Sequence, residues 1–155
     1  MNKVIISVIG IALLGAVGFF IFNRSNTTEI TPLPNISTNN AQVDIIPISH
    51  ATAVITWGDA TIYVTPVGGK DLFSDQSSPD FILITDIHRD HLDIETLEDI
   101  VASETVLVVP EAVAELLPAV PGKSSEPLAS RAVVLANGES APQLDFIVTA
   151  VPMYN

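Results

Sequence analysis

The sequence of 155 residues contains no cysteine. Disulfide bonds, thiolate nucleophiles, cysteine-based zinc sites and lipid attachment through a cysteine are therefore excluded. Basic residues are also scarce, because 6 Lys and Arg stand against 18 Asp and Glu, which gives a formal net charge of -12. A chain this acidic repels phosphate backbones, so nucleic acid is not an expected partner. Only 3 histidines are present, and their positions are therefore informative.

The N-terminal segment is strongly apolar. Residues 4–22, VIISVIGIALLGAVGFFIF, carry no charge, and as a helix they would extend roughly 28 Å, about the thickness of a bilayer core. We predict a transmembrane anchor or signal-anchor over residues 1–23. A cleaved signal peptide is the alternative, although its apolar region usually spans about 7–15 residues and ends at small side chains, whereas FFIFNRSN is bulky. By a narrow margin, the amino group and Lys3 outweigh Arg24 and place the N-terminus inside, which predicts a membrane-anchored protein with an extracytoplasmic domain.

A polar linker and one domain follow this segment. Residues 24–43 are rich in Asn, Thr, Ser and Pro and lack an apolar period, which is typical of a tether. In residues 44–155, β-rich runs and helical patterns follow one another, which predicts a mixed α/β domain built of layers. The expected elements are a hairpin with a two-residue turn at Gly58–Asp59, strands over residues 81–84 and 105–109, a helix over residues 94–102 capped by Asp93, a helix over residues 110–117 that begins at Pro110, and two strands joined through Asn137–Gly138 within residues 132–151.

Two of the three histidines lie together in the stretch TDIHRDHLD, residues 85–93. The stretch directly follows the apolar run FILI, and ligand sites in α/β proteins collect in the loops at the carboxyl ends of strands. In an extended segment Asp86, His88 and Asp90 point to one side, and a turn after Asp90 can bring His91 toward the same space. Imidazole nitrogens with carboxylate oxygens suit zinc, manganese or iron. The alternative is an ordinary solvated loop, and the clustering of scarce histidines behind a buried strand favours the metal site.

The segment ILITDIHRDHLD resembles the His-x-His-x-Asp-His loop of the metallo-β-lactamase superfamily. The preceding ISHATAVITWGDATIYVTP and PDFILIT resemble the lactonase-like and phosphodiesterase-like hydrolases of that superfamily, so the resemblance runs from residue 48 to about residue 155. It implies an αββα sandwich with a site for two divalent metal ions, zinc first and manganese or iron as alternatives. By motif position, Asp86 and His88 serve the first metal, Asp90 and His91 serve the second, and Asp90 also orients the catalytic hydroxide.

Three positions depart from that pattern. Asp86 stands where a histidine is usual, which hardens the first site toward manganese or iron. Thr65 replaces the aspartate of an IYVDP-like strand and removes a carboxylate that could support the ligands. Arg89 fills a position often taken by a small residue, where its cation either opposes metal binding or holds an anionic substrate. In the resembled branch His50 lies near the site, but a lone histidine beside an apolar strand is also typical of a hydrogen-bonded structural residue.

The family pattern also requires ligands that this sequence does not supply. No histidine follows His91, whereas the resemblance implies a third histidine, a bridging carboxylate and a last histidine further along. We therefore expect the N-terminal half of a metal-dependent hydrolase, inactive by itself, whose small-molecule substrate is a lactone, an amide or a phosphodiester. The alternative is a non-catalytic, truncated domain tethered to the membrane, which binds metal weakly or associates with a partner or with itself through an open sheet edge.

Overall fold

The computed structural model describes residues 42–152. The predicted anchor over residues 1–23 and the predicted linker up to residue 41 lie outside the described residues, and both stay predictions. Among the helices that are described, none is long and apolar enough to cross a membrane.

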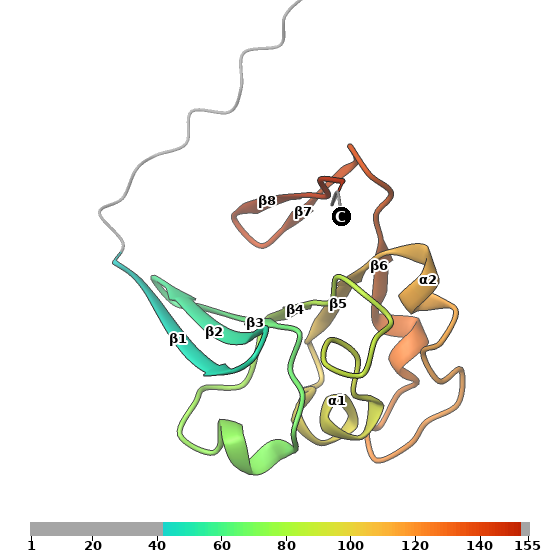
Figure 1. Cartoon of the computed structure of the whole chain (residues 1–155), viewed down its shortest axis with the longest axis horizontal. Helices are drawn as coiled ribbons and strands as arrows, with labels where there is room; N and C mark the ends of the chain where they lie inside the picture. Colours follow the sequence, from blue (N-terminus) through green and yellow to red (C-terminus); the bar gives the residue numbers. More distant parts are fainter. Residues whose placement is uncertain (1–41, 153–155) are drawn as a thin grey trace, which may run out of the picture. The chain divides into compact units, whose positions relative to one another are not determined.

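A six-stranded sheet forms the centre of the domain (Figure 1). The elements are β1 (Val43–Ser49), β2 (Thr52–Trp57), β3 (Ala60–Val64), β4 (Phe81–Leu83), α1 (Ile94–Ile100), β5 (Val106–Val109), α2 (Glu111–Ala114), β6 (Ala132–Val134), β7 (Ser140–Gln143) and β8 (Phe146–Thr149), with short 3₁₀ helices at Lys70–Phe73 and Leu128–Arg131. The strand order is β1-β2-β3-β4-β5-β6, with antiparallel pairing from β1 to β3 and parallel pairing from β3 to β6. Strands β7 and β8 form a separate antiparallel pair.

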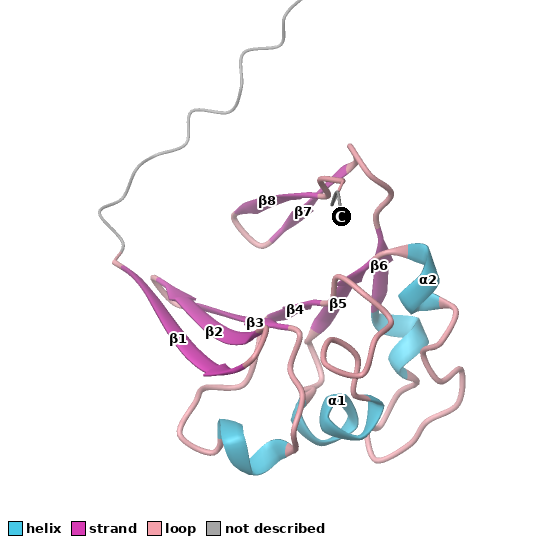
Figure 2. Ribbon diagram, viewed as in Figure 1, coloured by secondary structure: helices cyan, strands magenta, loops and turns pink. Residues whose placement is uncertain are grey.

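The central strands are apolar on both faces, and both faces are covered (Figure 2). On one face, Leu97 of α1 and Val113 of α2 are buried in one core with Ile82 of β4. On the other face, Phe146 of β8 lies over the sheet, with its ring centroid 6.0 Å from that of Phe81. The predicted mixed α/β layered fold is confirmed. The described residues form a helical layer, the large sheet and the small β7–β8 sheet, which is compatible with three layers of the expected αββα sandwich.

The predicted hairpin and the predicted helix cap are confirmed. Trp57 pairs with Ala60 across the two-residue turn, as the Gly-Asp pair indicates. Helix α1 begins directly after Asp93, and the side chain of Asp93 accepts a hydrogen bond from the Thr96 amide. Both features depend on interactions between residues that are close in the sequence, so the sequence alone indicates them.

The prediction for α2 is wrong in its extent. Pro110 is the N-cap in an extended conformation rather than the first helical residue, and regular helix ends at Ala114 instead of Leu117. The amides of Leu116 and Leu117 donate to the carbonyls of Val113 and Ala114 at 2.9 and 3.2 Å. The helix therefore tightens into 3₁₀ turns at its end, as short helices commonly do.

The prediction for residues 132–151 is wrong in its pairing. Three strands form instead of two, because β6 joins the large sheet parallel to β5. The Asn137–Gly138 turn does not close a hairpin between β6 and β7, and Gly138, with a φ of 86°, redirects the chain toward the separate β7–β8 pair. The hairpin closes at Leu144 and Asp145 instead, since Gln143 pairs with Phe146. Parallel pairing with the buried β5 thus overrides the local hairpin signal.

Asp93 joins helix α1 to the loop that follows β3. Its carboxylate accepts hydrogen bonds from the Thr96 amide at 3.2 Å, the Thr96 hydroxyl at 2.7 Å and the Gly68 amide at 3.1 Å. The Gly69 amide donates in turn to the Thr96 hydroxyl at 2.8 Å. Burial alone would raise the pKa of Asp93, but the hydrogen bonds from Thr96 and Gly68 outweigh it and hold that pKa below its ordinary value of 3.8. Asp93 therefore fixes the end of the TDIHRDHLD stretch.

Replacing Asp93 with alanine should lower the free energy of unfolding by about 1–2 kcal/mol, because the first turn of α1 loses its cap and the Gly68 amide loses its acceptor. The contribution of the ionised carboxylate is present above the ordinary pKa and is lost as the pH falls through the lowered pKa of the folded state. The matched variant Asp93→Asn keeps a capping side chain without the charge. Its stability deficit should be largest near about pH 7 and should shrink below about pH 4. Urea denaturation followed by circular dichroism measures both variants, and an equal deficit at both pH values would contradict the assignment.

Candidate metal centre

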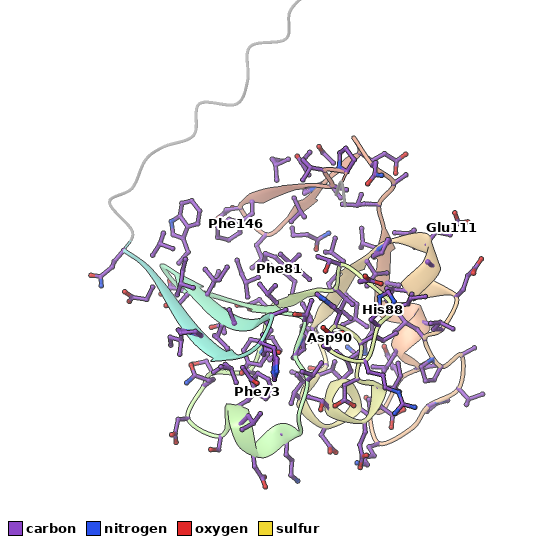
Figure 3. All side chains as sticks on the ribbon, in the orientation of Figure 1. Phe73, Phe81, His88, Asp90, Glu111 and Phe146 are labelled. Atoms are coloured by element: carbon purple, nitrogen blue, oxygen red, sulfur yellow. The ribbon has the colours of Figure 1, made fainter. Side chains whose placement is uncertain are left out.

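The TDIHRDHLD stretch forms the loop between β4 and α1, at the carboxyl edge of the parallel strands (Figure 3). Ile84 is still buried, and its amide donates to the carbonyl of Val108 at 3.1 Å, so sheet pairing continues one residue beyond β4. From Thr85 to Asp90 the side chains become mostly exposed. Apolar burial therefore ends just before the first candidate ligand, which leaves the polar side chains of the loop accessible.

Asp86 and His88 form the first pair of candidate ligands. The Oδ1 atom of Asp86 accepts hydrogen bonds from the amides of Ile87 and His88 at 2.5 and 3.3 Å, which fixes the carboxylate in a tight local turn. The same oxygen lies 2.9 Å from Nδ1 of His88, whose side chain is 74% exposed. The hydrogen bond with His88 lowers the pKa of Asp86, and the same hydrogen bond raises the pKa of His88. The Asp86 carboxylate and the His88 imidazole therefore hold each other in place, with Oδ1 of Asp86 next to Nδ1 of His88.

Asp90 and His91 form the second pair. The carbonyl of His88 accepts hydrogen bonds from the amides of His91 and Leu92 at 2.9 and 2.8 Å, so the turn predicted after Asp90 is present. Nδ1 of His91 lies 3.4 Å from Oγ1 of Thr85, and Nε2 lies 3.7 Å from Oδ2 of Asp90. The second distance is too long for a hydrogen bond. The turn thus brings His91 beside Asp90 without joining the two side chains directly.

Each pair fits two positions around a divalent ion. Nitrogen and oxygen ligands bind such ions at about 2.0–2.2 Å, so two ligands of one ion lie about 3–4 Å apart. The separation of 3.7 Å in Asp90–His91 agrees with that spacing. The 2.9 Å contact in Asp86–His88 is a hydrogen bond, so a metal ion held by these two atoms would replace the shared proton. Within residues 42–152, however, no group of three or more His, Asp or Glu side chains is arranged to hold a metal ion. The expectation that all four ligands share one space is therefore not met, and the loop presents them as two pairs.

The remaining candidates, His50 and Arg89, lie at the same sheet edge. His50 occupies the turn between β1 and β2 with a φ of 48°, and its Nδ1 lies 2.9 Å from Oγ of Ser49. Because β1, β2 and β3 alternate in direction, this turn lies at the edge where β3 and β4 end. Arg89 is exposed on the β4–α1 loop itself. The structure therefore gives His50 a hydrogen-bonded turn position and leaves Arg89 open to solvent beside the two pairs.

Thr65, at the position where the resembled family has an aspartate, links two chain segments at this edge. Its hydroxyl donates to the carbonyl of Ala51 at 2.9 Å, and its own carbonyl accepts a hydrogen bond from the Thr52 hydroxyl at 2.7 Å. Thr65 is buried and has a φ of 39°, so these bonds hold a conformation that threonine rarely adopts. Sequence reasoning missed this link and also the contact of Asp93 with Gly68, because neither a strand threonine nor a helix cap indicates a distant partner.

Comparison with known proteins relates the fold to others. Residues 44–155 match the profile of the β-lactamase superfamily domain. A structure from Parabacteroides distasonis ATCC 8503, assigned as a metal-dependent hydrolase, is similar with a TM-score of 0.55 and 23% identity over 74% of this chain and 52% of that chain. CmlA, a diiron β-hydroxylase from Streptomyces venezuelae, is similar with a TM-score of 0.53 and 21% identity over 74% of this chain and 24% of that chain. No protein of curated function matches the chain.

The two similar structures and the superfamily profile support different conclusions. At such identities the two structures show a shared fold alone, and the chain spans about half the length of the first of them. The superfamily profile, by contrast, covers the described domain from residue 44 onward, including the β4–α1 loop with its two ligand pairs. The chain therefore belongs to the metallo-β-lactamase superfamily.

Proposed function

We propose that this chain provides the metal-binding loop of a metal-dependent hydrolase that acts on a small molecule. The observation that carries the proposal is the pairing of Asp86 with His88 and of Asp90 with His91 on one loop of a superfamily member. Membership of the superfamily and the metal-dependent proteins of similar fold support the use of divalent metal. A lactone, an amide or a phosphodiester suits the proposal, since each presents a carbonyl or phosphoryl group to attack.

Each ligand pair has a proposed role in this chemistry. Asp86 and His88 hold one ion, and Asp90 and His91 hold a second. Bound divalent ions lower the pKa of water toward neutrality and polarise a carbonyl or phosphoryl oxygen. Asp90 accepts a hydrogen bond from the attacking water through a carboxylate oxygen and so directs it toward the substrate. Arg89, exposed on the same loop, attracts an anionic part of the substrate.

The ligand types bear on which metal binds. Imidazole nitrogen favours zinc, whereas the carboxylate of Asp86, in place of a histidine, raises the preference for manganese or iron. Each pair combines one carboxylate with one imidazole, so the two pairs offer the same ligand types, and zinc, manganese and iron all suit them.

Replacing His88 or His91 with alanine should lower the affinity for zinc and manganese at least about 100-fold. The reason is that even the loss of a residue that supports a ligand costs about 10–100-fold, and these residues are proposed as ligands themselves. Competition with a chromogenic chelator measures the affinity of the full chain. A further change, Asp86→His, should increase the preference for zinc over manganese, because imidazole is the softer ligand.

The matched control for these variants is His50→Ala, since His50 is the third histidine and its ring is engaged with Ser49 in the β1–β2 turn. The control should bind metal as the wild type does. A His88→Ala/His91→Ala double variant that retains its full complement of metal would show the assignment to be wrong.

A second candidate is a domain that binds metal without turnover. The observation that favours it is the number of ligands, because each pair supplies two, whereas catalytic zinc sites normally use three protein ligands. The chain by itself is expected to be inactive under both candidates, so the test places it in a longer protein that also carries the third histidine, the bridging carboxylate and the last histidine of the family pattern. Lactone, phosphodiester and β-lactam reporters then distinguish the candidates. Metal-dependent turnover that Asp90→Asn abolishes supports the hydrolase, and metal binding with no turnover supports the second candidate.

Attachment to a membrane through residues 1–23 is a further part of the proposal and rests on the uncharged run of residues 4–22. The expressed chain should remain with membranes after a carbonate wash and should retain its original N-terminus. A soluble product whose first residue lies near Ser25 would instead indicate a cleaved signal peptide.

A further inference from the structure

Strand β1 is an open sheet edge with an apolar surface. It is the first strand of the sheet order, so β2 is its one neighbour in the part of the chain that the structure describes. The first five residues of β1 are exposed, with Ile45 at 65% and Val43 at 44%, and the neighbouring Trp57 is 44% exposed. Soluble proteins usually protect such edges with several charges, but the one charged side chain of β1 is Asp44.

The β2–β3 turn determines which residues of β2 bond to β1. Trp57 and Ala60 flank a two-residue turn and therefore exchange hydrogen bonds with each other. The backbone groups of successive residues in a strand point alternately to the two neighbouring strands. Every second residue of β3 therefore bonds on the side of β4. Thr61 is such a residue, because its carbonyl accepts a hydrogen bond from the Asp80 amide at 2.9 Å. By the same alternation, Val54 of β2 bonds to β1.

The open edge of β1 follows from this alternation. Ile46 pairs with Val54, so its backbone N–H and C=O bond to β2. The same holds for Asp44, two residues before it. The backbone groups of Val43, Ile45 and Pro47 consequently point outward. The position of Pro47 agrees, because a strand accommodates proline where the missing N–H would face away from the ladder. The edge thus offers N–H donors at Val43 and Ile45 and carbonyl acceptors at all three residues.

We propose that β1 pairs antiparallel with β1 of a second copy of this chain, about a two-fold axis at Ile45. In this register Ile45 exchanges hydrogen bonds with Ile45 of the partner subunit, and the N–H of Val43 donates to the carbonyl of Pro47 of the partner subunit. A register centred on Asp44 makes as many hydrogen bonds, but it sets two aspartates directly opposite each other, which is destabilising. A register centred on Ile46 loses bonds because Pro47 has no donor. Charge and proline together therefore select the axis at Ile45.

The side chains support the same register. Val43 and Ile45 lie on the same face of the sheet as their cross-strand neighbours Trp57 and Ile55. On this face the ring centroids of Trp57 and Phe146 are 5.2 Å apart. The pairing places Ile45 against Ile45 of the partner subunit and extends this apolar face across the axis. Apolar surface that is now exposed is removed from water, which is the main driving force for association.

Analytical ultracentrifugation of the full chain in mild detergent tests the proposal. The wild type should sediment as a dimer. Ile45→Pro removes the outward N–H without breaking a bond to β2, and Ile45→Lys places two like charges at the axis. Both variants should raise the dimer dissociation constant at least about tenfold, because each removes contacts on both sides of the axis. The matched control is Ile147→Lys, since Ile147 is an equally apolar residue of β8 with 63% exposure, and it should leave the dimer unchanged.

Cross-linking tests the register. The chain has no cysteine, so a single introduced thiol reports one position. Directly opposite residues that exchange hydrogen bonds lie about 5.5 Å apart between Cα atoms, within the range that a disulfide spans. Ile45→Cys should therefore form an intermolecular disulfide faster than Ile147→Cys. A monomeric wild type, a dimer that both Ile45 variants leave intact, or equal cross-linking at the two positions would each overturn the proposal. If the chain associates through residues 4–22 alone, both Ile45 variants will leave the dimer intact.

Discussion

The burial of β4 on both faces is the constraint on which the rest of the domain depends. Ile82 faces the core beneath the helices, and Phe81 faces the core beneath the β7–β8 hairpin. A strand that is apolar on both sides requires cover on both sides, and it uses its backbone groups in parallel pairing with β3 and β5. Helices α1 and α2 and the hairpin supply that cover. Polar chemistry can consequently begin only beyond Ile84, where the chain leaves the sheet.

Around the β4–α1 loop, backbone hydrogen bonds rather than packing hold the polar side chains in place. Asp86 is fixed by the amides that follow it, and the carbonyl of His88 receives the amides of the returning chain. Asp93 then closes the loop by capping α1 and holding Gly68. Exposed Asp–His contacts contribute little to stability by themselves, so the two pairs are better suited to sharing a cation than to supporting the fold.

The sheet is therefore built differently at its centre and at its first strand. The centre is buried and covered, whereas β1 exposes apolar side chains and, among residues 42–152, has no neighbouring strand along its outer edge. Asp44 and Pro47 restrict how another strand can align with that edge, one by charge and the other by a missing donor. A sheet edge that accepts few alignments of a second strand favours one defined pairing, whereas an edge without such restrictions is prone to disordered aggregation.

What the sequence determined about this protein was local. The apolar run FILI predicted the buried strand, Gly58–Asp59 predicted the turn, and Asp93 predicted the start of α1, because run length, turn chemistry and capping act over a few residues. The scarce histidines behind FILI located the candidate site for the same reason. Only the tertiary structure decided that β6 joins β5 instead of pairing across Asn137–Gly138, that Thr65 holds Ala51, and that the four candidate ligands form two pairs rather than one group. These features depend on which distant surfaces are buried together and which distant backbone groups bond, and no short stretch of sequence contains that information.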